Sequence, residues 1–313
     1  MSTAAALFRP RLRRRRLLGR LFLVLCLAAV LLAVLVLGVL LVHVAWHGRQ
    51  FLSWRFLSAP PSQLDPERGG IRAALLGTVW LMVLTALIAV PTGVGAAIYL
   101  EEYAQRGRFA RFIHLNIANL AGVPSIVYGI LGLALFVRWL LGSRSLLAGT
   151  LTMSLLILPV IILASREALL AVPRSLREAA YAVGATRWQT VRHHVLPAAL
   201  PGIMTGVILA LSRAIGETAP LIMLGALTFV RFAPGEAGGD YTFTPAGVWG
   251  WLTAALDSPF TALPIQIYNW ASQPDEVFRR LAAAGIVVLL VALLSMNAVA
   301  AGIRAWQQRQ KTW

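Results

Sequence analysis

Two oppositely charged residues, Arg213 and Glu217, lie four positions apart inside a long apolar stretch of the chain. On a helix, residues at this spacing share a face and can form an ion pair. A guanidinium group stays charged at physiological pH, and its planar fork suits a tetrahedral oxyanion through two hydrogen bonds. The pair is therefore either a self-neutralising structural ion pair or part of a site for an anion.

Energetic arguments favour the anion site over a purely structural pair. Each charge near the centre of a bilayer costs roughly 2.5–3.5 kcal/mol, and apolar side chains serve a structural purpose at lower cost. Arginine before glutamate is also the less favourable order for an i,i+4 pair. Our hypothesis is that Arg213 binds a permeating anion. Glu217 then holds Arg213 when the site is empty, accepts a hydrogen bond from a protonated anion, and prevents binding too tight for release.

Small residues repeat on the same side of this stretch, at Gly202, Gly206 and Ala210. A G-x-x-x-G spacing allows two helices to approach closely, so we assign these three residues to helix packing. The charged pair is then expected to face another helix or a water-filled path rather than lipid. Pro220 lies just beyond Glu217 and is expected to end or kink the helix.

The composition indicates an all-α membrane protein with six transmembrane helices. Hydrophobic residues make up 58% of the 313 residues and charged residues 13%, against roughly 25% charged in soluble domains. A helix needs about 20 apolar residues to cross the hydrocarbon core of a bilayer. The first apolar run is too long for a signal peptide, so we interpret it as a retained anchor. The predicted spans are 18–44, 73–100, 112–140, 146–164, 198–224 and 281–303.

The distribution of arginine predicts which side of the membrane each segment faces. The net charge of +16 is not gathered on one soluble domain, as in a nucleic-acid-binding protein, but lies between the apolar runs. With a cytoplasmic N-terminus, about two-thirds of the 28 lysine and arginine residues fall on cytoplasmic segments, as the positive-inside rule expects. Both termini are then cytoplasmic. The predicted organisation is an N-tail 1–17, a transmembrane domain 18–303 with a cytoplasmic loop 165–197 and an outer loop 225–280, and a C-tail 304–313.

The cytoplasmic loop contains a short helix with signals at both ends. Ser175 and Glu178 have the spacing of a capping box, in which two side chains satisfy backbone donors of the first turn. Gly184 stands where a left-handed C-terminal cap requires glycine. One apolar face of this helix is formed by Leu176, Ala179, Ala180 and Val183.

A second capping-box spacing follows at Thr186 and Gln189 and is expected to open another helix that ends near Pro197. Helices this short are marginal in water on their own. The apolar face of the first helix therefore packs either on its own chain or on another protein, and the pattern leaves both interpretations open.

The chain lacks the residues that several kinds of chemistry require. Lys311 is the only lysine, so there is no P-loop, and ATP hydrolysis must come from a partner. Cys26 is the only cysteine, and His43 and His47 have no evident third ligand, so we predict neither a metal site nor a cofactor. An intramembrane enzyme needs a Ser–His pair or an H-E-x-x-H helix, and we find no convincing one. A passive channel or scaffold remains an alternative.

The run Glu178-Ala179-Ala180, followed after three residues by Gly184 and later by Leu196-Pro197, resembles the EAA signature of ABC importer permeases. The resemblance implies that this loop is a coupling helix that docks into a groove of an ATPase subunit. His194 departs from the signature, because isoleucine is usual there. The residues expected at the ATPase contact are Ser175, Leu176, Glu178, Ala179, Ala180, Val183 and Gly184.

The segment Arg213–Pro220 closely resembles the phosphate permeases, the PstA type more than its sister type PstC. Stretches 101–104, 123–129 and 262–270 agree, and the resemblance covers about residues 70–303. It implies a type I (MetI-like) importer fold in a bacterial plasma membrane. The implied partners are PstC, two PstB ATPases and the outer phosphate-binding protein PstS, and the implied substrate is inorganic phosphate. Permeases for phosphonate, molybdate or sulfate are the nearest alternative.

Overall fold

The computed structural model describes residues 12–104, 107–226, 230–236 and 245–309, and the regular elements within these ranges are helices. Five helices are long and apolar enough to cross a membrane, and there are six spans if one bent pair is counted as a span. This architecture confirms the predicted all-α class. The five are α1 (Leu12–Gly48), α3 (Arg72–Ile98), α6 (Leu146–Leu170), α9 (Leu196–Gly216) and α13 (Glu276–Arg309).

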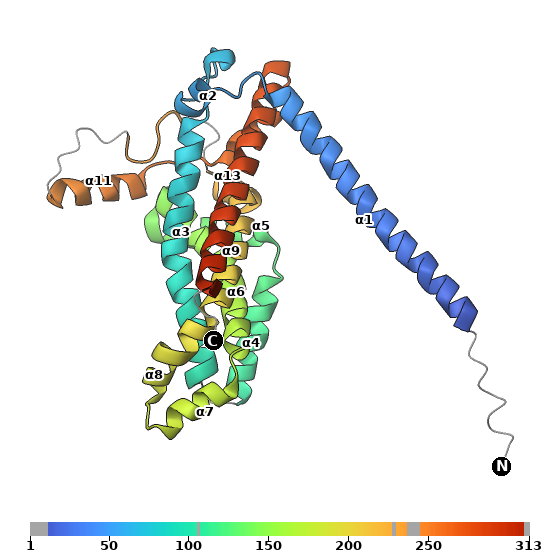
Figure 1. Cartoon of the computed structure of the whole chain (residues 1–313). Helices are drawn as coiled ribbons and strands as arrows, with labels where there is room; N and C mark the ends of the chain where they lie inside the picture. Colours follow the sequence, from blue (N-terminus) through green and yellow to red (C-terminus); the bar gives the residue numbers. More distant parts are fainter. Residues whose placement is uncertain (1–11, 105–106, 227–229, 237–244, 310–313) are drawn as a thin grey trace.

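The core of the bundle lies around α6, which packs against both α3 and α9 (Figure 1). In the most apolar window of α6, 67% of the residues are buried, the highest share among the five helices. Two buried hydroxyls on this helix are satisfied locally, since Thr150 and Thr152 donate to carbonyls one turn earlier at 2.9 and 2.8 Å, whereas those of Ser154 and Ser165 have no partner among the described residues. Pairing within the helix lowers the cost of burying a polar group away from water.

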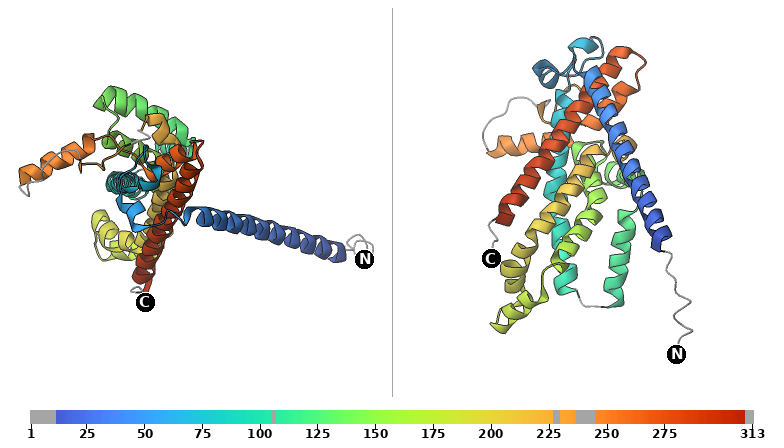
Figure 2. Two further views of the ribbon diagram at one scale, coloured as in Figure 1. Left: turned by 90° about the horizontal axis from the view of Figure 1, so that it is seen from above. Right: turned by 45° about the vertical axis from the view of Figure 1, so that its right-hand side comes forward.

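Helix α1 leans away from the rest of the bundle in Figures 1 and 2, and none of its most apolar window is buried. It meets α13 at its C-terminal end, where Gly48 lies against the backbone of Ala284. A Cβ atom at position 48 would approach the nitrogen of Ala284 to 2.7 Å, so glycine permits this contact. A helix that is apolar all round and unburied by its own chain needs lipid or another protein around it.

The third predicted span is not one straight helix. It consists of α4 (Arg108–Ala121) and α5 (Ser125–Gly132), the latter continuing as a π-helical stretch to Leu141, with a bend of 99° between the two arms. Pro124 lies at the break, where it supplies no N–H and disfavours helical geometry in the residue before it. The hydroxyl of Tyr128 donates to the carbonyl of Leu120 at 2.8 Å and braces the two arms across the bend.

The fifth predicted span, 198–224, is also broken. Helix α9 ends at Gly216, and a short helix α10 (Ala219–Leu224) begins after two intervening residues. Pro220 lies in the first turn of α10, so it has no N–H to donate to the carbonyl of Gly216 and a continuous helix cannot form. The prediction that proline ends the span is confirmed, but the break falls before the proline.

The loop between α6 and α9 forms α7 (Arg174–Ala182) and α8 (Arg187–Thr190). Helix α8 runs through a π-helical turn, Val191–Val195, directly into α9. The prediction that the second helix ends near Pro197 is therefore wrong. The wider turn just before the proline lets the chain continue as a helix although one N–H is missing.

On the side of the bundle away from α7, short helices connect the spans: α2 (Trp54–Ser58), α11 (Pro245–Asp257) and α12 (Leu263–Ala271). Figure 1 shows α11 projecting sideways from the bundle. Its Trp251 ring packs edge-on against Trp80 at 5.4 Å, whereas Trp249 is exposed. Helix α12 is fixed to α3, because the hydroxyl of Thr78 accepts a hydrogen bond from the backbone N–H of Leu263 at 2.8 Å.

Candidate functional site

Arg213 and Glu217 lie at the C-terminal end of α9, beside the break in the fifth span. The Nε atom of Arg213 is 3.2 Å from Oε1 of Glu217, so the two side chains form the expected ion pair. Arg213 belongs to the last turn of the helix, whereas Glu217 is the first residue beyond it, with extended backbone angles of φ −78° and ψ 116°. The pair therefore joins the helix to the non-helical connection rather than two points on one helical face.

The two partners differ in exposure. The side chain of Arg213 is 53% exposed in this chain and that of Glu217 is 18% exposed. Within the residues that the structure describes, Glu217 is the only hydrogen-bond partner of Arg213, and it engages Nε. The two terminal Nη groups remain available. These groups form the fork that binds an oxyanion through two hydrogen bonds.

The two broken spans meet next to this ion pair. Helix α5 packs on α10, and Gly129 lies so close to Pro220 that a Cβ atom would reach the proline Cα at 2.6 Å. Non-helical backbone at membrane depth is tolerated where it is buried in protein or lines a water-filled cavity. Discontinuous helices near the middle of the membrane are a recurring feature of transporter sites. Sequence reasoning anticipated the proline but not the contact between the two breaks.

The predicted small-residue face of α9 lies against α6. A Cβ atom added at Gly202 would be 2.8 Å from that of Ala168, one added at Gly206 would overlap that of Ala164, and Ala210 is 1% exposed. These positions bring the two helix backbones together, which is the role expected of a G-x-x-x-G spacing. Arg213 takes part in neither contact, so the residues of α9 that pack against α6 are distinct from its charged residue.

The predicted capping box at the start of α7 is wrong. The residue that caps this helix is Pro173, and no side chain accepts a hydrogen bond from its first turn. The helix begins at Arg174, so Ser175 and Glu178 already lie inside it, where Ser175 is two positions too late to act as the cap. Proline before the first turn is a sufficient start signal, because its fixed φ of −55° leads the chain into the helix.

The end of α7 and the start of α8 follow the predictions. Gly184 has a φ of +85°, and the N–H of Ala185 bonds to the carbonyl of Ala180 at 3.1 Å, which closes the helix with a left-handed cap. The capping box formed by Thr186 and Gln189 is present in both directions. These two signals depend on local chemistry alone.

The apolar face predicted for α7 divides between two environments. Ala180 is buried and Leu176 is half-buried against the bundle, whereas Ala179 is exposed and Val183 is 84% exposed. Glu178 is exposed as well. The helix therefore packs on its own chain with one side, as the first interpretation expects, and presents an apolar and acidic side outward; packing of that side on another protein stays a prediction.

Sequence reasoning did not predict the hydrogen bonds by which Arg177 fixes α7 to the ends of two spans. Arg177 bonds through Nε and Nη2 to Glu102 at 3.1 and 2.8 Å, and through Nη1 and Nη2 to the carbonyls of Val172 and Leu169. Glu102 follows the end of α3, and Leu169 belongs to the last turn of α6. Arg177 therefore ties α7 to the ends of α3 and α6.

A second ion pair reinforces the same junction. Arg166 of α6 bonds to Glu101, and their side chains are 26% and 14% exposed. The signal available in the sequence was the adjacent acidic pair 101–102 at the end of a span, facing a loop rich in arginine. Their partners lie 65 and 75 positions away, which local pattern reasoning does not reach.

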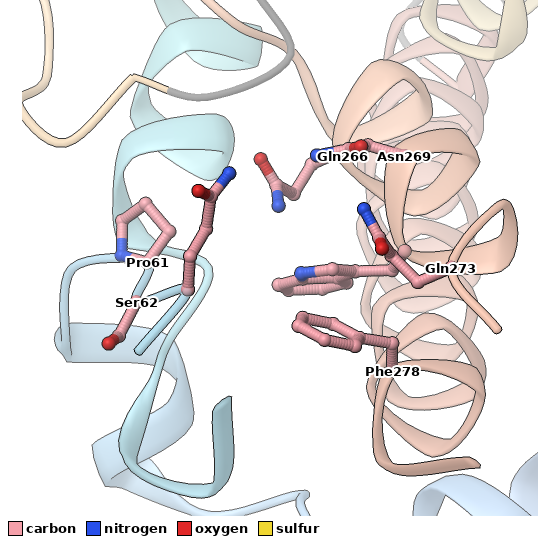
Figure 3. Close-up of a pocket in the computed structure, with 8 residues that line it drawn as sticks. Pro61, Ser62, Gln266, Asn269, Gln273 and Phe278 are labelled. Carbon is pink, nitrogen blue, oxygen red and sulfur yellow. The ribbon is translucent and has the colours of Figure 1, made fainter. Parts of the chain in front are cut away.

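A cavity of about 260 Å³ at the opposite end lies between the 61–63 loop, α12 and the start of α13 (Figure 3). Its lining is Pro61, Ser62, Gln63, Gln266, Asn269, Trp270, Gln273 and Phe278. Its described lining contains amide, hydroxyl and aromatic groups but no charged side chain. An oxyanion site requires charge-assisted donors to be strong, so this cavity is a weaker candidate for an anion than the surroundings of Arg213.

The fold is that of the transmembrane subunits of ABC importers, which confirms the predicted MetI-like class. The chain aligns with a chain of the crystal structure of a bacterial alginate ABC transporter with a TM-score of 0.61 and 17% identity, over 94% of this chain and 99% of that one. An inward-facing MetNI methionine ABC transporter aligns with a TM-score of 0.52 and 18% identity, over 76% of this chain and 95% of that one.

Residues 89–312 match the family of binding-protein-dependent transport system inner membrane components, and the chain belongs to this family. It is 32% identical to the probable ABC transporter permease YqgI of Bacillus subtilis, over 88% of this chain and 90% of that protein. It is 34% identical to the phosphate transport system permease PstA 1 of Mycobacterium tuberculosis, over 79% and 75% of the two chains. Its identity to PstA of Yersinia pestis is 31%, over 91% and 90%.

Family membership establishes the general role of the chain. It is a multi-pass inner-membrane component of a transporter that works with a separate binding protein, and the hydrolysis of ATP takes place on another subunit.

Proposed function

We propose that this chain is the PstA-type permease subunit of an ATP-driven phosphate importer and forms half of the translocation pathway. Its relatives include several phosphate transport permeases over most of its length. The observation that carries the proposal is the half-exposed guanidinium of Arg213 at a helix break, with its Nη fork available. In a single chain this group faces outward, as half of a shared pathway requires.

Arg213 acts as the transient binding group for phosphate. The ion pair with Glu217 holds the guanidinium in place through Nε while the Nη atoms face the permeating anion. Because Glu217 is an acceptor, it takes a hydrogen bond from the monoprotonated form of phosphate. The negative charge of Glu217 also lowers the affinity of Arg213 for the anion, so that phosphate dissociates from the site.

The remaining partners follow from this assignment. A PstC-type permease supplies the other half of the pathway, and a PstS-type protein delivers phosphate from outside. The complex contains two PstB-type ATPases, and one of them binds the outward side of α7, where Glu178, Ala179 and Val183 are exposed. The chain has both termini in the cytoplasm of a bacterium. In support, the beginning of α1 and the end of α13 point toward the end of the molecule that carries α7 (Figure 1).

Uptake of labelled phosphate by the assembled complex in proteoliposomes tests the proposal. We expect Arg213→Gln to lower uptake about tenfold or more, because a hydrogen bond to a charged group contributes about 1.5–3 kcal/mol. Glu217→Gln lowers turnover because bound phosphate is released slowly. Arg55→Gln, an exposed arginine of α2, is the matched control and keeps normal uptake. Normal uptake in both pathway variants contradicts the proposal.

The same assay separates phosphate from other oxyanions. Unlabelled phosphonate, molybdate and sulfate are added in excess to the wild-type complex. A phosphate importer keeps most of its labelled phosphate uptake under these conditions. Strong inhibition by one of these anions assigns the complex to that substrate instead.

A further inference from the structure

A groove of about 870 Å³ opens between the end of α3, the beginning of α4 and the end of α6, at the end of the bundle that carries α7. Among the described residues, its charged lining consists of three arginines and a single glutamate. Arg166 is already paired with that glutamate, Glu101. Arg108 and Arg111 are both exposed and therefore give the groove a surplus of positive charge.

The lining of the groove changes from charged to apolar along its length. On α4 the arginines occupy the first turn, His114 follows one turn later, and Leu115 and Ala118 line the groove further toward the middle of the bundle. On the facing helix, Leu163 continues the apolar part. A phospholipid has the same order, with an anionic headgroup at the membrane surface and acyl chains that extend inward.

Further donors converge on the charged part of the groove. The first turn of α4 contains no acidic residue and no side-chain cap, so its backbone N–H groups face the end of the helix, where anions are stabilised. These backbone donors complement the two exposed guanidinium groups.

We propose that this groove is a specific site for an anionic phospholipid, whose phosphate contacts Arg108 and Arg111 and whose acyl chain lies along Leu115 and Ala118. Basic pockets between transmembrane helices on the cytoplasmic side bind anionic headgroups in other membrane proteins. Free inorganic phosphate uses only the charged half, whereas more than half of Leu115 remains exposed and needs an apolar cover. A lipid accounts for both halves.

Native mass spectrometry of the full-length chain released from detergent tests this site with phosphatidylglycerol and phosphatidylcholine as probes. We expect phosphatidylglycerol to be retained preferentially. The double variant Arg108→Gln/Arg111→Gln should lower its binding constant at least tenfold, because each basic group near an anionic surface contributes roughly fivefold. The control Arg187→Gln/Arg192→Gln removes two exposed arginines from the same end of the bundle and leaves binding unchanged.

The apolar half is tested separately with Ala118→Trp, which fills the inner part of the groove without changing its charge. We expect this variant to weaken retention of phosphatidylglycerol while the thermal unfolding midpoint stays that of the wild type. Equal retention by the wild type and both groove variants overturns the proposal. So does displacement of phosphatidylglycerol by millimolar inorganic phosphate, which assigns the groove to the free anion, or loss of the lipid in the assembled complex, which assigns it to a partner helix.

Discussion

The ion pair that fixes α7 and the ion pair at the C-terminal end of α9 differ in how fully each arginine is engaged. Near α7, Arg177 makes four hydrogen bonds to Glu102 and two backbone carbonyls, and its side chain is only 18% exposed. Near the helix break, Arg213 bonds only to Glu217 through one nitrogen within the described chain and is 53% exposed. A fully engaged arginine fixes a junction, whereas a partly engaged one retains donors for a ligand. Stability and transport should therefore respond oppositely at the two sites.

The largest effect on stability is expected at the junction. Arg177→Gln leaves Glu102, which is 8% exposed, without its cation and removes bonds to the last turn of α6. Breaking one partner of a buried ion pair costs about 3–5 kcal/mol. The free energy of unfolding in detergent micelles measures this loss. Arg174→Gln, on the exposed side of the same helix, is the control and should change stability by less than about 0.5 kcal/mol. Equal losses of unfolding free energy in the two variants would show that the hydrogen bonds of Arg177 do not stabilise this junction.

A smaller loss is expected from Gly206→Ala, because the added Cβ atom meets the Cβ of Ala164 and forces α9 away from α6. Overpacking of this kind costs about 1–3 kcal/mol. Gly95→Ala is a matched substitution within α3, where nothing lies within 4 Å of the added atom. The control should be neutral or stabilising because alanine favours helix. If both variants unfold alike, the close packing of α9 on α6 is not important for stability.

The left-handed cap at the end of α7 is expected to contribute less to stability than these contacts. Gly184→Ala places a side chain at a φ of +85°, which costs roughly 1–2 kcal/mol. Asparagine tolerates this conformation better, so Gly184→Asn should recover much of the loss. Thermal unfolding midpoints of the two variants provide the comparison, and a Gly184→Asn midpoint as low as that of alanine contradicts the conformational explanation.

The smallest effect on stability is expected at the candidate pathway residue. Arg213→Gln removes an exposed side chain with a single partner, so the free energy of unfolding should change by less than about 0.5 kcal/mol. Phosphate uptake by the same variant is nevertheless expected to fall. A large loss of stability with unchanged transport per folded complex would show that the ion pair is structural.

Features that depend on local chemistry were predictable from the sequence. The apolar runs located the membrane helices, and the φ requirement at Gly184 and the box at Thr186 and Gln189 were read from neighbouring residues. The start of α7 was misread because Ser175 has suitable cap chemistry, whereas Pro173 determines where the helix begins. A residue type alone does not identify its position in a helix.

Features that depend on distant contacts were not predictable. The breaks at Pro124 and Pro220 became informative only when α5 was seen to pack on α10, and the joint of Arg177 with Glu102 connects residues far apart in sequence. Hydrophobic patterns specify which segments are buried, but they do not specify which charged groups meet. The charged pair Arg213 and Glu217 was found because its partners are only four positions apart.

The central claim is that Arg213 acts on the permeating phosphate, and ATP hydrolysis by the assembled complex tests it most directly. Hydrolysis is measured in proteoliposomes that contain the permeases, the ATPases and the binding protein, with and without phosphate, for the wild type and Arg213→Gln. We predict that phosphate stimulates hydrolysis by the wild type and that most of this stimulation is lost in the variant, although the complex assembles normally. Equal stimulation of both complexes by phosphate contradicts the account.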